Sequence, residues 1–192
     1  GIPASNLNFG ASYNPDSIIS QASQFDFYDG GGLDIAFLGM AQIDEVGNVN
    51  VSRYGKFLSG CGGFINITQS TKKVVFCGTF TAGNLKIAVK DGKIAILKEG
   101  DHKKFIKKVE QITFNGKYAL QNKQEVVYIT ERGVFVLTKN GLTLTEISPG
   151  INLEQDIIKQ MDFMPIISKK LKLIKNKIFY LIITEVIQSI VD

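Results

Sequence analysis

The sequence has little of several residue types on which common protein classes depend. It contains no tryptophan, one histidine and two cysteines among 192 residues. Two cysteines are too few for a disulfide-stapled scaffold or a cysteine-rich zinc site, and one histidine gives little support to a Ser-His-Asp triad or a histidine-based metal centre. We therefore expect free thiols, no metal ion and, with no secretory leader in view, a cytoplasmic location.

Concentrated positive charge is also lacking. The net charge is +4: residues 1–70 carry two basic and six acidic side chains, and residues 71–192 carry twenty and twelve. The lysines of the second part are scattered among acidic residues, without the arginine clusters or interleaved aromatic residues typical of nucleic-acid modules. We expect a solvated, lysine-rich face and no nucleic-acid partner.

No hydrophobic run is long enough for a standard membrane span. The segment 178–191 is strongly apolar but only fourteen residues long, and it contains Thr184, Glu185 and Gln188. A helix that crosses a bilayer needs about twenty apolar residues. This segment therefore predicts a helix docked against the core, and no membrane partner is expected.

What is present suits one globular domain, because 44% of the residues are hydrophobic and the chain is long enough to bury a sizeable core. Two nearly uninterrupted apolar runs, 33–43 and 74–80, predict strands buried on both faces of a parallel sheet. Between them we expect a short strand at 49–52, a glycine loop and a helix that begins at 64–67.

The middle of the sequence predicts antiparallel strands. Its short β-branched runs are separated by the turn dipeptides Asp91-Gly92, Arg132-Gly133 and Asn140-Gly141. These runs are 85–89, 94–97, 126–130, 134–138 and 142–147. The predicted fold class is therefore α/β, a mainly parallel open sheet with flanking helices plus antiparallel hairpins.

Two further helices are expected, one before and one after the predicted strands. Ile18, Ile19 and Ala22 have helical spacing and predict a short helix that ends before Phe25. After Pro149-Gly150, Asn152 can cap a helix that carries Glu154 and Asp156 in its first turn. Acidic residues in a first turn complement the helix dipole.

Few side chains are candidates for catalysis. His102 lies in the polar run Asp101-His102-Lys103-Lys104, which indicates a surface histidine. Cys61 lies in a glycine loop and could be exposed, whereas Cys77 lies in an apolar strand and is expected to be inert packing. A group of carboxylates could suggest acid-base work or Mg²⁺ binding, but turn and strand-end solvation is favoured. These carboxylates are Asp26, Asp29, Asp34, Asp44 and Glu45.

The loop Gly60-Cys61-Gly62-Gly63 precedes Phe64 and the predicted helix. Glycines leave backbone N–H groups uncovered, so an anion or a developing oxyanion can approach them closely. The loop lacks the spacing and lysine of a P-loop, and Ile65 stands where a dinucleotide fingerprint needs its last glycine. Taken alone, the pattern fits a structural turn as well as an anion site.

Taken in order with its neighbours, the loop belongs to a series of motifs that resembles the C-terminal half of family I coenzyme A-transferases. The branch it is most similar to is the single-chain acetate, propionate and acetoacetate transferases. The resemblance covers roughly residues 1–179. Beyond Phe179 the sequence departs from the family. The motifs that carry it are GIPAS (1–5), NLNFG (6–10), QFDFYDGGGLD (24–34), FLGMAQ (37–42), GNVNVS (47–52), GCGGF (60–64), KKVVFCGTF (72–80) and INLEQDI (151–157).

The resemblance implies covalent catalysis by a carboxylate. A glutamate attacks the acyl-CoA thioester, CoA returns to give a glutamyl-CoA thioester, and an acceptor carboxylate completes the exchange. That glutamate is expected about five residues upstream of Gly1. The resemblance assigns the oxyanion amide to Gly62 and coenzyme A contacts to Gly60, Cys61, Gly63 and Phe64, although Phe64 could equally be core.

The resemblance also sets expectations for organisation and partners. Residues 1–192 are expected to form a single C-terminal domain, a fragment of a longer chain that would be inactive alone. Acyl-CoA, a short-chain carboxylate, the N-terminal half of the same enzyme and a homo-oligomer are the expected partners, with coenzyme A a substrate and no cofactor bound permanently. The alternatives are a non-catalytic CoA- or anion-binding module and a hydrolase that uses Cys61.

Overall fold

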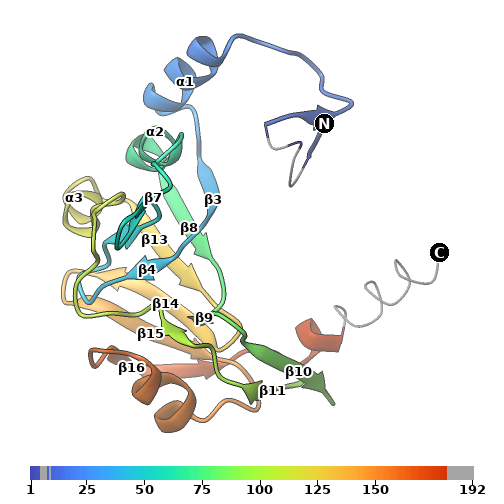
Figure 1. Cartoon of the computed structure of the whole chain (residues 1–192), viewed down its shortest axis with the longest axis vertical. Helices are drawn as coiled ribbons and strands as arrows, with labels where there is room; N and C mark the ends of the chain where they lie inside the picture. Colours follow the sequence, from blue (N-terminus) through green and yellow to red (C-terminus); the bar gives the residue numbers. More distant parts are fainter. Residues whose placement is uncertain (5–7, 9, 181–192) are drawn as a thin grey trace.

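A six-stranded sheet forms the centre of the computed structural model, which describes residues 1–4, 8 and 10–180. The strand order is β16-β15-β14-β13-β8-β3 (Figure 1). The strands are β3 (Ile35–Gly39), β8 (Lys73–Cys77), β13 (Glu125–Ile129), β14 (Gly133–Thr138), β15 (Gly141–Ile147) and β16 (Ile166–Leu173). Strands β3, β8 and β13 are parallel, β14 is antiparallel to both neighbours, and β15 and β16 are parallel. This arrangement confirms the predicted α/β class.

Short helices connect or flank the strands. They are α1 (Gln21–Asp29), α2 (Phe64–Ser70), α3 (Gly116–Gln121), the π-helical turn η2 (Leu153–Ile157) and the 3-10 turn η3 (Ile158–Gln160). The side chains of Ser20, Asn115 and Asn152 cap α1, α3 and η2 by accepting a backbone N–H three residues on. The cap predicted at Asn152 is confirmed. Helix α2 leads into β8 and α3 leads into β13, so both lie on crossovers between parallel strands.

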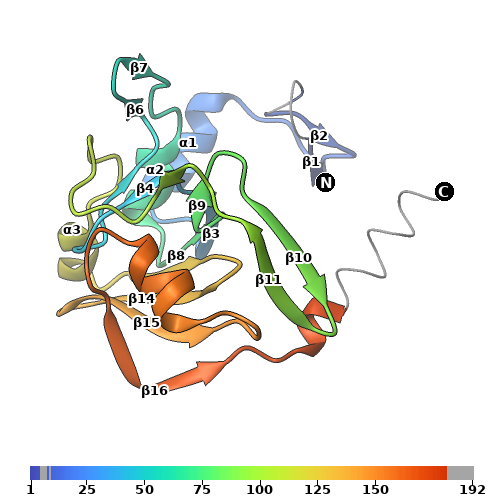
Figure 2. The ribbon, with the colours of Figure 1, turned by 60° about the horizontal axis from the view of Figure 1, so that its bottom comes forward.

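Pairs of shorter strands decorate the sheet. They are β1 (Ile2–Pro3) with β2 (Ser12–Tyr13), β4 (Gln42–Ile43) with β5 (Val49–Asn50), β6 (Arg53–Tyr54) with β7 (Phe57–Leu58), β9 (Thr81–Ala82) with β12 (His102–Lys103), and β10 (Lys86–Lys90) with β11 (Lys93–Lys98). The β10–β11 hairpin projects from the body of the molecule (Figure 2). Its turn residues, Asp91 and Gly92, both have positive φ, as a tight hairpin turn requires.

The hydrophobic core lies against one face of the sheet. Phe76, Tyr128 and Phe135 project from β8, β13 and β14 onto this face and are fully buried. The opposite face is open at the β3 edge, where Phe37 is 68% exposed. Cys77 is also exposed, which corrects the expectation that it is inert packing. Alternate residues of a strand face opposite sides, so Cys77 lies on the face opposite Phe76, where it is only partly buried.

Other expectations differ in detail from the structure. Helix α1 begins at Gln21 and runs through Phe25, because Ser20 caps it and leaves Ile18 and Ile19 outside. The apolar run 33–43 is broken at Met40 and Ala41 into β3 and β4. The sequence analysis does not predict α3 or β16. The docking helix expected at 178–191 falls mainly outside the described residues.

Candidate active site

The glycine loop links β7 to α2 in a conformation that favours glycine. Gly60 and Gly62 have φ of +77° and +52°, in the left-handed region that side-chain-bearing residues rarely adopt. The loop is held from one side, because the Gly60 amide donates to the Ser52 carbonyl at 3.2 Å. From the other side, the Phe64 amide donates to the Cys61 carbonyl at 3.0 Å as α2 begins.

The middle of this loop presents unused hydrogen-bond donors. Within the part of the chain that the structure describes, the amide groups of Cys61, Gly62 and Gly63 donate to no acceptor. Cys61 and Gly62 are exposed, and a Cβ built on Gly62 would meet nothing within 4 Å. The Gly62 N–H therefore lies on bare backbone that an oxygen atom of a ligand can approach, and the exposed Cys61 N–H is adjacent to it.

The next glycine has a packing role instead. A Cβ built on Gly63 would lie 2.6 Å from Cζ of Phe25, so only a glycine lets α1 approach α2 this closely. Asn66 of α2 also donates to both carboxylate oxygens of Asp29, at 3.0 and 3.1 Å, where α1 ends. These contacts fix the loop against α1.

An open cleft of about 820 Å³ lies beside the loop. Gly62 and Gly63 form part of its wall, and Phe25 and Tyr28 of α1 form another part. The N-terminal segment lines it as well, through Ala4 and residues 10–12. The structure thus brings the start of the chain and the glycine loop to the same cleft.

Of the other loop residues, Cys61 is exposed and Phe64 is not. The Phe64 ring is 8% exposed and stacks on the Phe76 ring, with centroids 5.7 Å apart. Phe64 therefore lies in the core, and a contact with the pantetheine arm stays a prediction. Cys77 ends β8 on the open face of the sheet, where partial burial raises the pKa of its thiol.

Three of the five carboxylates that the sequence assigns to turns and strand ends have structural partners, and Asp29 is one of them, through Asn66. Asp34 pairs with Lys72 on the surface, at 2.7 Å. Asp44 is buried and accepts from the amides of Val46 and Asn48 in the turn before β5. His102 is exposed, as expected. No cluster of three or more metal-ligating side chains, and no helix long and apolar enough to cross a bilayer, occurs among the described residues.

Two buried charged residues were not singled out from the sequence. Arg132 is fully buried and Lys104 is 6% exposed. Arg132 lies in a dipeptide that predicts only a turn, and Lys104 lies in a run of polar residues that predicts a surface. Partners distant in sequence bury both, so no local pattern could have identified them.

The chain is similar to known proteins over most of its length, although no family model matches it. It is 55% identical to a caffeate CoA-transferase from Acetobacterium woodii over 93% of this chain and 35% of that one. It is 28% identical to one of the subunits of a 3-oxoadipate CoA-transferase from Pseudomonas knackmussii, over 74% of this chain and 54% of that one. The solved apoenzyme structure of the acyl-CoA transferase YdiF from Escherichia coli O157:H7 superposes with a TM-score of 0.86 and 50% identity, over 88% of this chain and 33% of that one. The chain thus spans about a third of the most similar of these three relatives.

Proposed function

Because the chain belongs to the family I coenzyme A-transferases, as a C-terminal, β-subunit-like part of them, we propose that it supplies the oxyanion site of a short-chain acyl-CoA:carboxylate CoA-transferase. The observation that carries the proposal is the cleft that is lined both by Gly62, whose amide is unpaired, and by the N-terminal segment. A nucleophile placed just upstream of Gly1 would enter the same cleft from that segment.

In the proposed reaction the loop stabilises negative charge on the thioester oxygen. When a glutamate carboxylate attacks the thioester carbonyl, the carbonyl oxygen gains negative charge before the CoA thiolate leaves. Amides already aimed at that oxygen stabilise the charge without reorganising. Returning thiolate then displaces the acyl carboxylate from the mixed anhydride, and an acceptor carboxylate reverses both steps to leave as a new acyl-CoA.

In this scheme the Gly62 amide is the principal donor, while Gly60 shapes the turn. Cys61 adds a second amide, and Gly63 sets the distance to α1. Losing one oxyanion-hole donor typically costs roughly 3 to 4 kcal/mol of barrier. Phe64 supports the loop from the core through Phe76.

The test uses the full-length protein with acetyl-CoA and a carboxylate acceptor. We expect CoA exchange, and borohydride reduction in the presence of acetyl-CoA should label one glutamate that peptide mapping places just before Gly1. The isolated 192-residue chain should show no exchange. Exchange by that chain alone, or labelling within it, would contradict the proposal.

The two alternatives give different results in the same assays. A non-catalytic CoA- or anion-binding module binds acetyl-CoA but exchanges nothing in either form. A hydrolase that uses Cys61 releases CoA without an acceptor and loses that activity on alkylation. Exchange that depends on the acceptor and leaves a labelled glutamate excludes both.

A further inference from the structure

The two edges of the central sheet differ in character. Strand β16, at one edge, carries the exposed side chains of Lys169, Lys170 and Lys172, and lysines of this kind protect the free edge of a sheet. Strand β3, at the other edge, has no charged residue from Ile35 to Gly39 and pairs only with β8 in the described part of the chain. The β3 edge therefore lacks the charges typical of an edge in contact with water.

The sheet face opposite the core is apolar beside this edge. We call this surface the open face, and it consists of Ile35, Phe37, Val75, Cys77, Val127 and Ile129. Phe37, Val75 and Val127 lie next to one another in register across β3, β8 and β13. An ion pair of Lys73 with Glu125, at 3.2 Å, borders the open face at the amino ends of β8 and β13. The apolar side chains thus form one continuous surface with a charged border.

The sequence of these strands predicts that the open face is covered in the complete protein. Strands buried on both faces read as continuous apolar runs, whereas strands with one wet face alternate between apolar and polar residues. The runs 33–43 and 74–80 do not alternate. Phe37 is nevertheless 68% exposed, and Ile35 and Ile129 are exposed as well. The described residues cover only one of the two faces that this sequence predicts to be buried.

The place of this chain in longer proteins indicates what covers the open face. The chain corresponds to a C-terminal part of its relatives and spans 35% of the caffeate CoA-transferase. Most of a protein of that length would precede Gly1. In Figure 1 the N-terminal segment and α1 lie at the β3 end of the sheet, away from β16. The β3 edge and its open face are therefore the part of the sheet nearest to that upstream chain.

We propose that the chain upstream of Gly1 in the full-length protein packs on the open face, with the apolar side of a helix against Phe37 and Val75. A helix suits this position because parallel strands are joined by crossover helices that cover the sheet. Helices α2 and α3 cover the core face in this way, through the buried side chains of Phe64 and Ala119. The proposal rests on membership of the family and not on the proposed oxyanion site.

A photo-crosslinker on the open face would identify the segment that covers it. Phe37 of the full-length protein is replaced by p-benzoylphenylalanine, the protein is irradiated, and the adducts are located by peptide mass spectrometry. We expect an adduct within one chain, with a peptide that precedes Gly1. An adduct with residues 181–192, or a crosslinked dimer, would assign the open face to the end of this chain or to a second copy and would overturn the proposal.

The matched control places the same analogue at Leu97, on the projecting β10–β11 hairpin. Leu97 is 67% exposed, so its contact with water in the described chain equals that of Phe37. We expect no adduct with the upstream chain from this position. A yield at Phe37 no higher than at Leu97 would mean that the open face contacts water, and would overturn the proposal as well.

Charge substitutions at the same two positions test the cover without a bulky analogue. If both side chains contacted water, Phe37→Asp and Leu97→Asp would be equally mild. Under a covering helix, Phe37→Asp buries a carboxylate without a partner. We expect it to lower the thermal midpoint of the full-length protein by about 5 °C more than Leu97→Asp does. Equal midpoints would contradict the proposal.

These measurements need no enzymatic activity, which keeps them apart from the proposed function. A crosslink from Phe37 to the upstream chain, in a protein that exchanges no CoA, would sustain the covered face and reject the transferase. CoA exchange by a protein in which Phe37 gives no such crosslink would do the reverse.

Discussion

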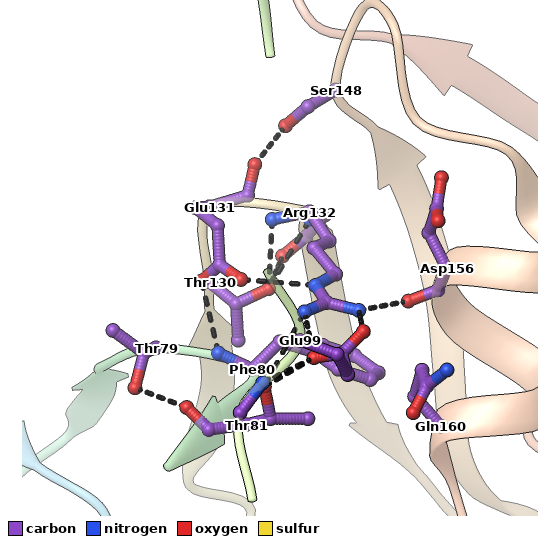
Figure 3. A network of polar contacts seen from close by, with 12 residues as sticks. Thr79, Phe80, Thr81, Glu99, Thr130, Glu131, Arg132, Ser148, Asp156 and Gln160 are labelled. Carbon is purple, nitrogen blue, oxygen red and sulfur yellow. Dashed lines mark hydrogen bonds and ion pairs between the residues drawn. The ribbon is translucent and has the colours of Figure 1, made fainter. Parts of the chain in front are cut away.

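Arg132 and Glu99 form a two-pronged ion pair, in which Nη2 lies 2.5 Å from Oε1 and Nη1 lies 2.9 Å from Oε2 (Figure 3). The guanidinium also donates to Glu131 Oε1 and to the Asp156 carbonyl, and it lies over the Phe80 ring, 4.9 Å from the centroid. One fully buried side chain thereby ties the end of the β10–β11 hairpin to the β13–β14 turn and to η2.

This geometry predicts a large loss of stability on substitution of Arg132. Arg132→Met removes one partner and leaves the carboxylates of Glu99 and Glu131 uncompensated, which should cost about 3 to 5 kcal/mol in urea unfolding. Lys72→Met, which breaks the exposed pair with Asp34, is the control and should cost less than about 1 kcal/mol. Similar losses in the two variants would contradict the structural role of Arg132.

The same pair predicts a specific acid sensitivity. Burial alone would raise the pKa of Glu99, but the hydrogen bonds and charge of Arg132, with smaller help from Thr81 and Gly100, hold it below the ordinary value of 4.5. Stabilisation by a carboxylate with a lowered folded-state pKa is complete above the unfolded-state value and is lost as pH falls through the folded-state one. Glu99→Gln should therefore be less stable than wild type at pH 7, and the difference should shrink below pH 4.5. A constant difference across this range would argue against the pair.

The Arg132 cluster combines features that local sequence patterns predict with one that they do not. The strands on either side of it were predictable, because β-branched runs between turn dipeptides are local features. The burial of Arg132 was not, because its partner Glu99 lies 33 residues away. Strand β16 was missed for a related reason: its lysines give it no clean alternation, and its pairing with β15 determines its structure.

The functional residues were likewise predictable from the sequence only in part. The motifs around Gly62 were sufficient to identify the family and the loop, and the positive φ of Gly62 fits the turn inferred from them. The burial of Lys104 needed the structure. Gly78, Met40 and Lys104 pack together there, and they come from separate segments that no linear pattern connects.

The two adjacent glycines of the loop should respond differently to alanine. Gly63→Ala places a methyl group 2.6 Å from the Phe25 ring and should cost about 1 to 3 kcal/mol by overpacking. Gly62→Ala meets open space and should cost only the left-handed backbone penalty, roughly 1 kcal/mol. Chemical denaturation measures both, and a coupling energy between Gly63→Ala and Phe25→Leu would identify the contact. Equal costs without coupling would show that α1 does not pack on the loop as described.

Alkylation of Cys61 should probe the same loop during turnover. Its side chain is exposed beside the Gly62 amide, so N-ethylmaleimide should reach it, place a bulky group next to that amide and inactivate CoA exchange. Cys61→Ser should retain CoA exchange and resist this inactivation. Cys77→Ser is the matched control: Cys77 is also exposed but lies at the end of β8, so its replacement should not protect. Loss of exchange in Cys61→Ser itself would instead indicate a chemical role for the thiol.

Lys104 should reduce the stability of the free protein. The Lys104 side chain is largely buried and its ammonium group makes no hydrogen bond or ion pair among the described residues, so burial weakens its charged form and Lys104→Met should be more stable by about 1 kcal/mol at pH 7. Burial lowers the pKa of this amine below the ordinary value of 10.5, so the unfolded chain binds more protons between the two values and wild-type stability rises with pH. The advantage of Lys104→Met should therefore shrink as pH approaches 10.5. Urea unfolding of both proteins at several pH values measures it, with Lys107→Met as the exposed control. A variant less stable than wild type at pH 7 would mean that Lys104 supports the fold.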